Sequence, residues 1–100
     1  MTLTPQEIKA QALSKIKLSL RIVTNAFDDE ISDLMDAAAL DLGVAGVTNT
    51  VLTDALVLRA ITTYCRMHFG EPDQYDRLKA SYDEQKAQMS NATNYTDWSD

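Results

Sequence analysis

Cysteine is nearly absent from this 100-residue chain, which contains only Cys65. A single cysteine excludes an internal disulfide, and with a single histidine, His68, the chain lacks the Cys and His ligands of a zinc site. Glycine and proline are also scarce, with three and two residues. Because these two residues interrupt regular structure most often, their scarcity predicts long helices.

Basic residues are outnumbered by acidic ones. Nine Lys and Arg face fifteen Asp and Glu, which gives a net charge of -6 and a pI near 4.5. Nonspecific affinity for nucleic acid comes mainly from Lys and Arg, which displace condensed counterions, so this balance argues against a protein that grips phosphate backbones. Solubility alone explains such acidity. The acidity would have a function if DNA must pass close to the protein without binding to it.

Long apolar runs are missing as well. In the amino-terminal segment the apolar residues are interrupted by Glu7, Lys9, Lys15 and Lys17. Neither a signal peptide nor a membrane span is therefore expected, and the cytoplasm is the compartment that fits a single cysteine. One hundred residues suffice for one hydrophobic core, so a single domain is expected.

The apolar periodicity predicts an all-α fold: a compact bundle of four helices over residues 1–89 and an extended C-terminal tail over residues 90–100. Thr4-Pro5-Gln6-Glu7 has the pattern of a capping box with proline at the first helical position, so the first helix should run from there to about Arg21. A short connection follows at residues 22–25.

The second helix should begin near Phe27, with Asp28, Asp29 and Glu30 in the first turn, where the helix dipole favours negative charge. Gly43 is expected to end this helix as a left-handed cap.

The third helix should begin at a cap provided by Thr50 or Thr53 and end at Phe69, before Gly70. It is apolar on most sides, which predicts a central position with Ile61 in the core. A fourth helix is expected from about Pro72, with an apolar seam of Tyr75, Leu78, Tyr82, Gln85 and Met89. Two heptads are too few to define a coiled coil, and packing on the bundle is the simpler interpretation.

No catalytic residue, metal ligand set or cofactor site is expected, so the chain is not predicted to be an enzyme. Cys65 and His68 share a helix face but have no third group to complete a nucleophile or metal site. The acidic residues between Asp28 and Asp36 do not have the spacing of a calcium loop, and a solvated helix face explains them.

The tail at residues 90–100 is the segment that folding does not explain. It is mostly small and polar, yet it contains Tyr95 and Trp98. Such aromatics either remain without structure or anchor a protein interface, because they bury large areas with little loss of rotamer entropy.

Taken together, these segments resemble the head-tail connector (adaptor) proteins of tailed phages and prophages. The resemblance covers nearly the whole chain and depends on order and spacing. The segments that carry it are KLSLRI at 17–22, FDDEI at 27–31, YDRLKASY at 75–82 and NYTDW at 94–98.

The resemblance implies a structural virion protein at the head-tail junction, made in the host cytoplasm. It would form a ring, usually twelvefold, with neighbouring copies beneath the portal protein, and a downstream neck or tail-completion protein would dock on it. DNA would pass through its channel without specific binding, and no membrane is involved. Candidate interface residues are Tyr95, Trp98, Tyr82, Asp28 and Asp29.

A small helical DNA-binding regulator is the alternative. Two helices joined by a short turn invite comparison with the helix-turn-helix motif. The candidate recognition helix, residues 54–69, carries only Arg59 and Arg66 as cations, which equips it poorly to read a major groove.

Overall fold

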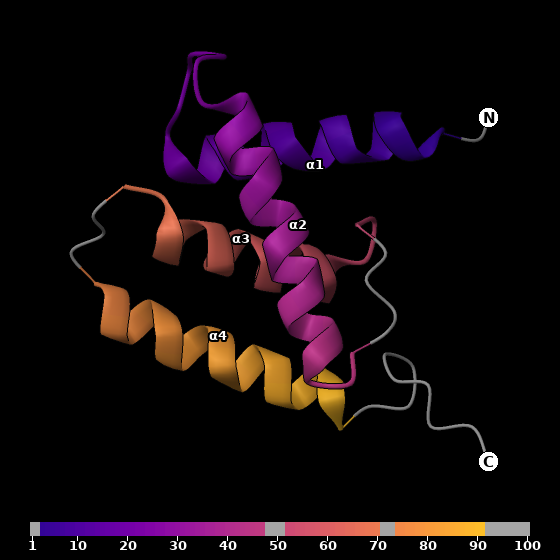
Figure 1. The fold of residues 1–100 in the computed structure, drawn as a ribbon, viewed down its shortest axis with the longest axis vertical. Helices are drawn as coiled ribbons and strands as arrows, with labels where there is room; N and C mark the ends of the chain where they lie inside the picture. The colour runs from indigo at the N-terminus through magenta and orange to yellow at the C-terminus, as the bar shows by residue number, and fades with distance from the viewer. Residues whose placement is uncertain (1–2, 48–51, 71–73, 92–100) are drawn as a thin grey trace.

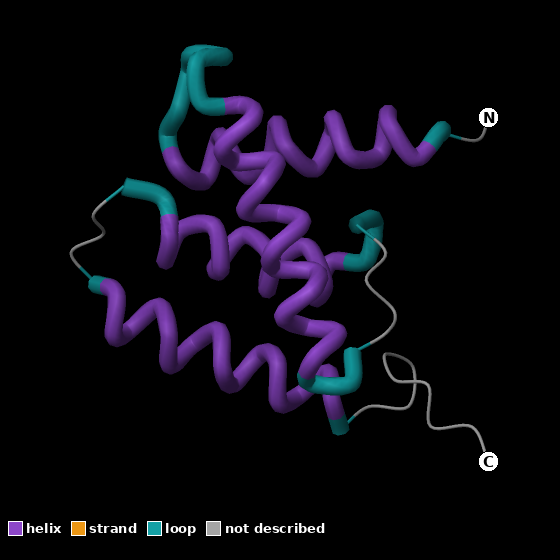
Figure 2. Tube along the Cα trace, in the orientation of Figure 1, coloured by secondary structure: helices purple, strands orange, loops and turns teal. Residues whose placement is uncertain are grey.

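The computed structural model describes residues 3–47, 52–70 and 74–91. Within them the chain forms four α-helices: α1 (Pro5–Leu20), α2 (Asp28–Val44), α3 (Ala55–His68) and α4 (Tyr75–Ser90) (Figure 1). Loops join the helices, and no described segment forms a strand (Figure 2). The predicted all-α fold is confirmed.

The helix α3 occupies the centre of the fold, as predicted. In Figure 1, α1, α3 and α4 lie alongside one another, and α2 crosses them. The helix α3 contacts each of the other three, while α1 also contacts α2. Along its shortest axis the molecule extends only 17 Å, which is the thickness of about two layers of packed helices.

The start of α1 is the capping box that the sequence predicts. The Thr4 hydroxyl accepts a hydrogen bond from the Glu7 amide at 3.1 Å, and the Glu7 carboxylate accepts one from the Thr4 amide at 3.2 Å. The helix ends at Arg21, whose backbone is left-handed (φ 60°).

The predicted left-handed cap of α2 is wrong. Gly43 lies inside the helix, which continues to Val44, and Gly46 adopts the left-handed conformation instead (φ 93°). The amides of Gly46 and Val47 donate to the carbonyls of Gly43 and Leu42 at 3.0 and 2.9 Å. This pair of bonds is a Schellman motif. Val47 is fully buried beyond it, so burial of this residue fixes the cap after Val44.

The predicted cap of α3 is also wrong. Asp54 is the N-cap, and its carboxylate accepts hydrogen bonds from the amides of Leu56 and Val57 at 2.9 and 3.3 Å. Thr53 lies one residue too early to do this, and Thr50 lies outside the described residues. At the other end, Gly70 is left-handed (φ 68°), as a helix stop requires.

The core contains residues from every helix. Ile61 is fully buried in α3, as predicted. The helix α3 nevertheless has an exposed side, which includes Leu56, Arg59 and Arg66, although the sequence indicated little polar surface. The buried apolar residues are Ala12, Ile16, Ile31, Met35, Ala38, Leu42, Val47, Val57, Ala60, Ile61, Cys65, Met67, Tyr82 and Met89.

The seam of α4 packs on the bundle, mainly against α3. Tyr82 and Met89 are buried, and Leu78 and Gln85 are half-buried, whereas Tyr75 is 39% exposed. The helix begins at Tyr75, and Pro72 lies outside the described residues. None of the described helices has the length and apolar character needed to span a membrane.

Candidate interaction surfaces

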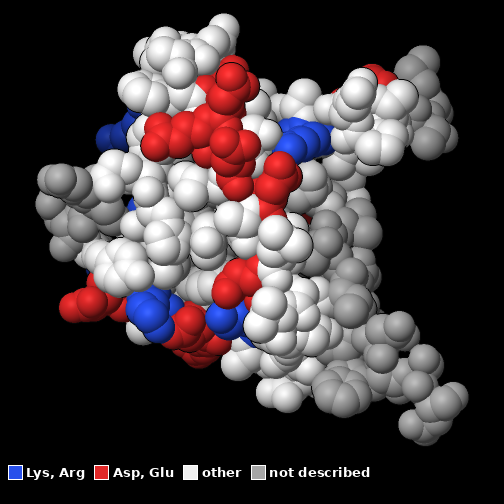
Figure 3. All heavy atoms as spheres, viewed as in Figure 1, with Lys and Arg blue, Asp and Glu red and all other residues white. Residues whose placement is uncertain are grey.

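One face of α2 presents acidic and apolar side chains in a single row. Asp29, Asp33, Asp36, Leu40 and Val44 are spaced by four, three, four and four residues, so they follow one side of the helix. All five are exposed, with Leu40 at 73% and Val44 at 89%. We call this row the α2 stripe. Acidic side chains gather over the first half of α2 in Figure 3.

The two predicted interface residues at the start of α2 have different environments. Asp28 is half-buried and forms an ion pair with Lys17 of α1 at 2.8 Å. It therefore joins the end of α1 to the start of α2. Asp29 is exposed and forms no ion pair with a described residue. Of the two, Asp29 has the geometry of a free surface residue.

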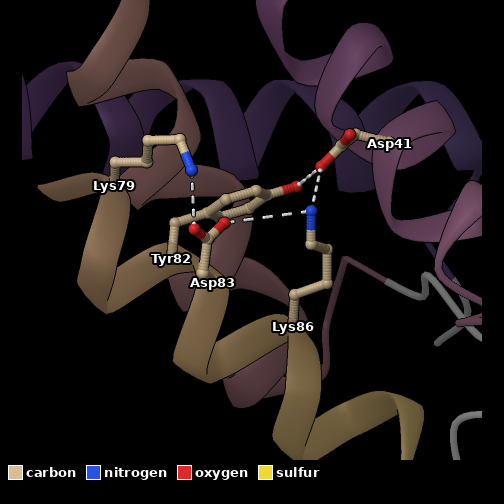
Figure 4. A network of polar contacts seen from close by, with 5 residues as sticks. All are labelled: Asp41, Lys79, Tyr82, Asp83 and Lys86. Atoms are coloured by element: carbon tan, nitrogen blue, oxygen red, sulfur yellow. Dashed lines mark hydrogen bonds and ion pairs between the residues drawn. The ribbon is translucent and has the colours of Figure 1, made fainter.

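Tyr82, the third predicted interface residue, links α4 to α2 within the chain (Figure 4). The residue is 2% exposed, and its hydroxyl donates a hydrogen bond to Asp41 at 2.5 Å. Lys86 reaches the same carboxylate oxygen at 3.1 Å. Tyr82 is thus buried and makes its contacts within the chain.

The pKa values of this network follow from its contacts. Burial by itself would raise the pKa of Asp41, but the hydrogen bond from Tyr82 and the ion pair with Lys86 outweigh burial, so the pKa of this carboxyl lies below its ordinary value. Burial, and then the bond to Asp41, raise the pKa of Tyr82. Both groups therefore keep their ordinary charge states near neutral pH, as a structural contact requires.

Cys65 and His68 do not form a reactive pair. Cys65 is fully buried, and burial raises the pKa of its thiol to about 12, which disfavours the nucleophilic thiolate. His68 is exposed, and its ring lies tilted at 48° against that of Tyr64, with ring centroids 4.4 Å apart. Among the described residues, no cluster of three or more His, Cys, Asp or Glu side chains is placed to hold a metal ion.

A groove between α1 and α4, floored by α3, is lined by cations. Its cavity has a volume of about 490 Å³. Arg59 and Arg66 come from α3 and Lys15 from α1, and all three are exposed. A neighbouring cavity of about 390 Å³ shares Arg66 with it and adds Arg21. We call the two cavities together the basic groove. No Asp or Glu of the described chain lines either cavity.

The wall of the groove contains an unsatisfied polar atom. Gln85 of α4 lines the larger cavity, and its side-chain oxygen is buried without a hydrogen-bond partner among the described residues. Buried polar atoms without partners are rare in folded proteins. Leu58 and Leu78 add half-buried apolar surface to the same wall. The groove thus combines positive charge with apolar contact area.

The basic groove and the apolar half of the α2 stripe were not predicted from the sequence. Arg59 and Arg66 are seven residues apart, a spacing that places both on one helix face and that could have indicated the groove floor. Nothing local indicates that α1 and α4 flank that face. The predicted interface residues Tyr95 and Trp98 lie outside the described residues.

Comparison with known proteins identifies one family. The family described as phage connector protein matches residues 12–96, which span all four helices apart from the first turns of α1. No curated protein and no solved structure matches the chain.

Proposed function

The chain belongs to the phage connector protein family, and from this premise we propose that it joins the portal of the DNA-filled head to the tail. In this proposal, copies form a ring beneath the portal, extend the DNA channel and present a docking face to the next neck or tail protein. The match over residues 12–96 carries the proposal. The family is structural, which agrees with the inert environment of Cys65.

The charge of the chain supports the proposed channel role. A net charge of -6 disfavours attachment to a duplex that must move past the ring. A ring of such chains would repel a phosphate backbone instead of holding it.

Electron microscopy of purified portal rings, with and without this protein, tests the proposal. We expect an added annular layer with the symmetry of the portal. If folded protein adds no density, the portal-joining role is wrong. The chain would then be another neck component or the helical DNA-binding regulator, which salt-sensitive affinity for duplex DNA would identify.

We further propose that the tail at residues 90–100 attaches the protein to a partner through Tyr95 and Trp98. Replacing both by alanine in the full chain should weaken attachment to the portal by at least about tenfold, because each buried interface aromatic is worth roughly 2 kcal/mol. Truncation after Asn91, which keeps all four helices, should have at least the same effect. Unchanged attachment in both variants would contradict this role.

A further inference from the structure

Unpaired positive charge is concentrated in the basic groove. Lys15, Arg21, Arg59 and Arg66 line it and are four of the nine Lys and Arg in the chain. None of the four forms an ion pair with a described residue. The ion pairs within the described chain involve other cations, namely Lys9, Lys17, Lys79 and Lys86. The groove is thus a positive region on an acidic protein, and its charge is uncompensated within the described chain.

The complementary surface lies elsewhere on the same chain. No residue of α2 lines the groove, which is built from α1, α3 and α4 with Thr53 before α3. The α2 stripe carries Asp29 and Asp33, both exposed and without an ion pair among the described residues. Because α2 is packed on α3 and takes no part in the groove, a chain cannot place its own stripe in its own groove. The complement must come from another molecule.

The two surfaces also match in apolar character. The second half of the stripe presents Leu40 and Val44, which are among the most exposed large apolar residues of the described chain. The groove offers Leu58 and Leu78 beside its cations. A phosphate backbone would satisfy the arginines but would leave this apolar surface without a counterpart, and the net charge of -6 would oppose it. The combination favours a protein helix with acidic and apolar halves as the occupant.

We propose that the basic groove binds the α2 stripe of a second copy of this chain, so that copies associate head to tail. The contact is heterologous: the groove of one copy meets the stripe of the next, and the pair keeps one free groove and one free stripe. Repetition of such a contact closes into a ring when the rotation per copy allows it. The inference rests on the proposed function and identifies the surfaces through which neighbours in the ring touch.

Charge reversal on each surface tests the contact. The groove variant carries Lys15→Glu, Arg59→Glu and Arg66→Glu, which leave Arg21 as the one described cation lining the basic groove, and the stripe variant carries Asp29→Lys and Asp33→Lys. In the groove variant both surfaces are acidic, and in the stripe variant both are basic, so each should repel further copies of itself. An equimolar mixture restores opposite charges at every contact, because copies of the two variants can alternate around a ring with an even number of subunits.

The readouts are the number of copies bound per portal ring, counted by electron microscopy, and sedimentation velocity of the free proteins. Each variant alone should show at least a tenfold loss of association relative to the unmodified protein, and the mixture should recover most of it. Recovery by mixing excludes misfolding as the cause of the loss. Arg77→Glu and Glu84→Lys are matched controls, since both positions are exposed and line neither cavity, and both should associate like the unmodified protein.

Other results would overturn the inference. If both variants associate as the unmodified protein does, the groove and the stripe are not in contact. If each variant loses association and the mixture recovers none, the groove binds something other than the stripe. Duplex DNA that binds the unmodified protein but not the groove variant would identify that ligand as nucleic acid. If both variants still add an annular layer to the portal, the proposed contact is wrong and the connector role remains supported. If the unmodified protein adds no annular layer, the connector role is wrong. Sedimentation of the free proteins and of their mixture would still show whether the groove binds the stripe.

Discussion

Tyr82 shows how a single residue joins helices that are distant in sequence. Its ring packs edge-on against Tyr64 of α3, with centroids 5.4 Å apart, and its hydroxyl binds Asp41 of α2. Lys86 lies over the same ring and shares the same carboxylate. A surface position would need none of these contacts. Tyr82 and Lys86 of α4 therefore hold this helix against α2 and α3.

Replacing Tyr82 by Phe should lower the free energy of unfolding by about 1 kcal/mol, the value of a hydrogen bond to a charged group reduced for partial exposure of Asp41. Because the pKa of Asp41 is lowered from its ordinary value of 3.8, the hydrogen bond contributes its full stabilisation at pH values above 3.8. It is lost as the pH falls through the lowered pKa. Urea denaturation from pH 7 to pH 2 measures it, and the two proteins should converge in acid.

Tyr75→Phe is the matched control for this prediction. Tyr75 is 39% exposed, and its hydroxyl forms no hydrogen bond with a described residue, so its loss should change stability by less than about 0.5 kcal/mol. Equal effects of the two substitutions would show that the bond to Asp41 does not stabilise the fold.

Replacing Ile61 by Ala should destabilise the monomer by about 2 to 5 kcal/mol, through lost burial and the cavity left behind. Ile61 is fully buried in the central helix, whereas Leu40 is 73% exposed. Leu40→Ala should therefore leave monomer stability within about 0.5 kcal/mol. Thermal unfolding of both variants measures the difference, and an unchanged melting temperature for Ile61→Ala would place the core elsewhere.

Helix ends show how tertiary packing decides the boundaries of an element. Gly43 and Gly46 both occur where α2 could end, and the chain uses only the second as the left-handed residue. The burial of Val47 requires the turn to follow Val44, so the helix continues through Gly43. In the same way Asp54 caps α3 because its carboxylate reaches two free amides. Each boundary follows from what is buried or bonded just beyond it.

The two glycines should respond in opposite directions to substitution by alanine. Gly43→Ala should stabilise the protein by about 0.5 to 1 kcal/mol, because alanine favours a helix and limits the unfolded chain. Gly46→Ala should destabilise it by about 1 to 2 kcal/mol, because a side chain is strained at φ 93°. An added Cβ meets no atom within 4 Å at either position, so steric clashes do not confuse the comparison. Urea denaturation of both variants gives the sign, and a stabilising Gly46→Ala would contradict the assigned cap.

The whole molecule separates its charges between two surfaces. The α2 stripe concentrates acidic residues on one helix, and the basic groove gathers Lys15, Arg21, Arg59 and Arg66 from α1, the turn after it and α3. Within a chain only 17 Å thick, such a separation gives each copy a positive and a negative contact surface. It is an arrangement suited to repeated head-to-tail contacts.

Association between copies should therefore weaken as salt is raised from about 0.1 M to 1 M, since the screening length falls from about 10 Å to about 3 Å. The melting temperature of the monomer should change little over the same range, because its ion pairs are exposed or partly exposed to solvent and each contributes little. Sedimentation velocity and thermal unfolding at matched salt concentrations check both statements. Association that strengthens with salt would indicate an apolar contact without the proposed charge pairing.

Features that depend on neighbouring residues could be predicted from the sequence. The capping box at Thr4 and Glu7, the acidic first turn of α2 and the burial of Ile61 all follow from spacing within a few turns of helix. Order and spacing along the chain also sufficed for the resemblance to phage connectors, which the family match over residues 12–96 confirms.

The contacts between residues distant in sequence could not be predicted in this way. Tyr82 and Asp41 are 41 positions apart, and the groove combines Lys15 of α1, Arg59 of α3 and Gln85 of α4. Periodicity identifies the buried face of a helix but not the helices that pack beside it. Those neighbours depend on how all four helices bury their apolar faces at once, and for that physical reason the groove exists only in the folded chain.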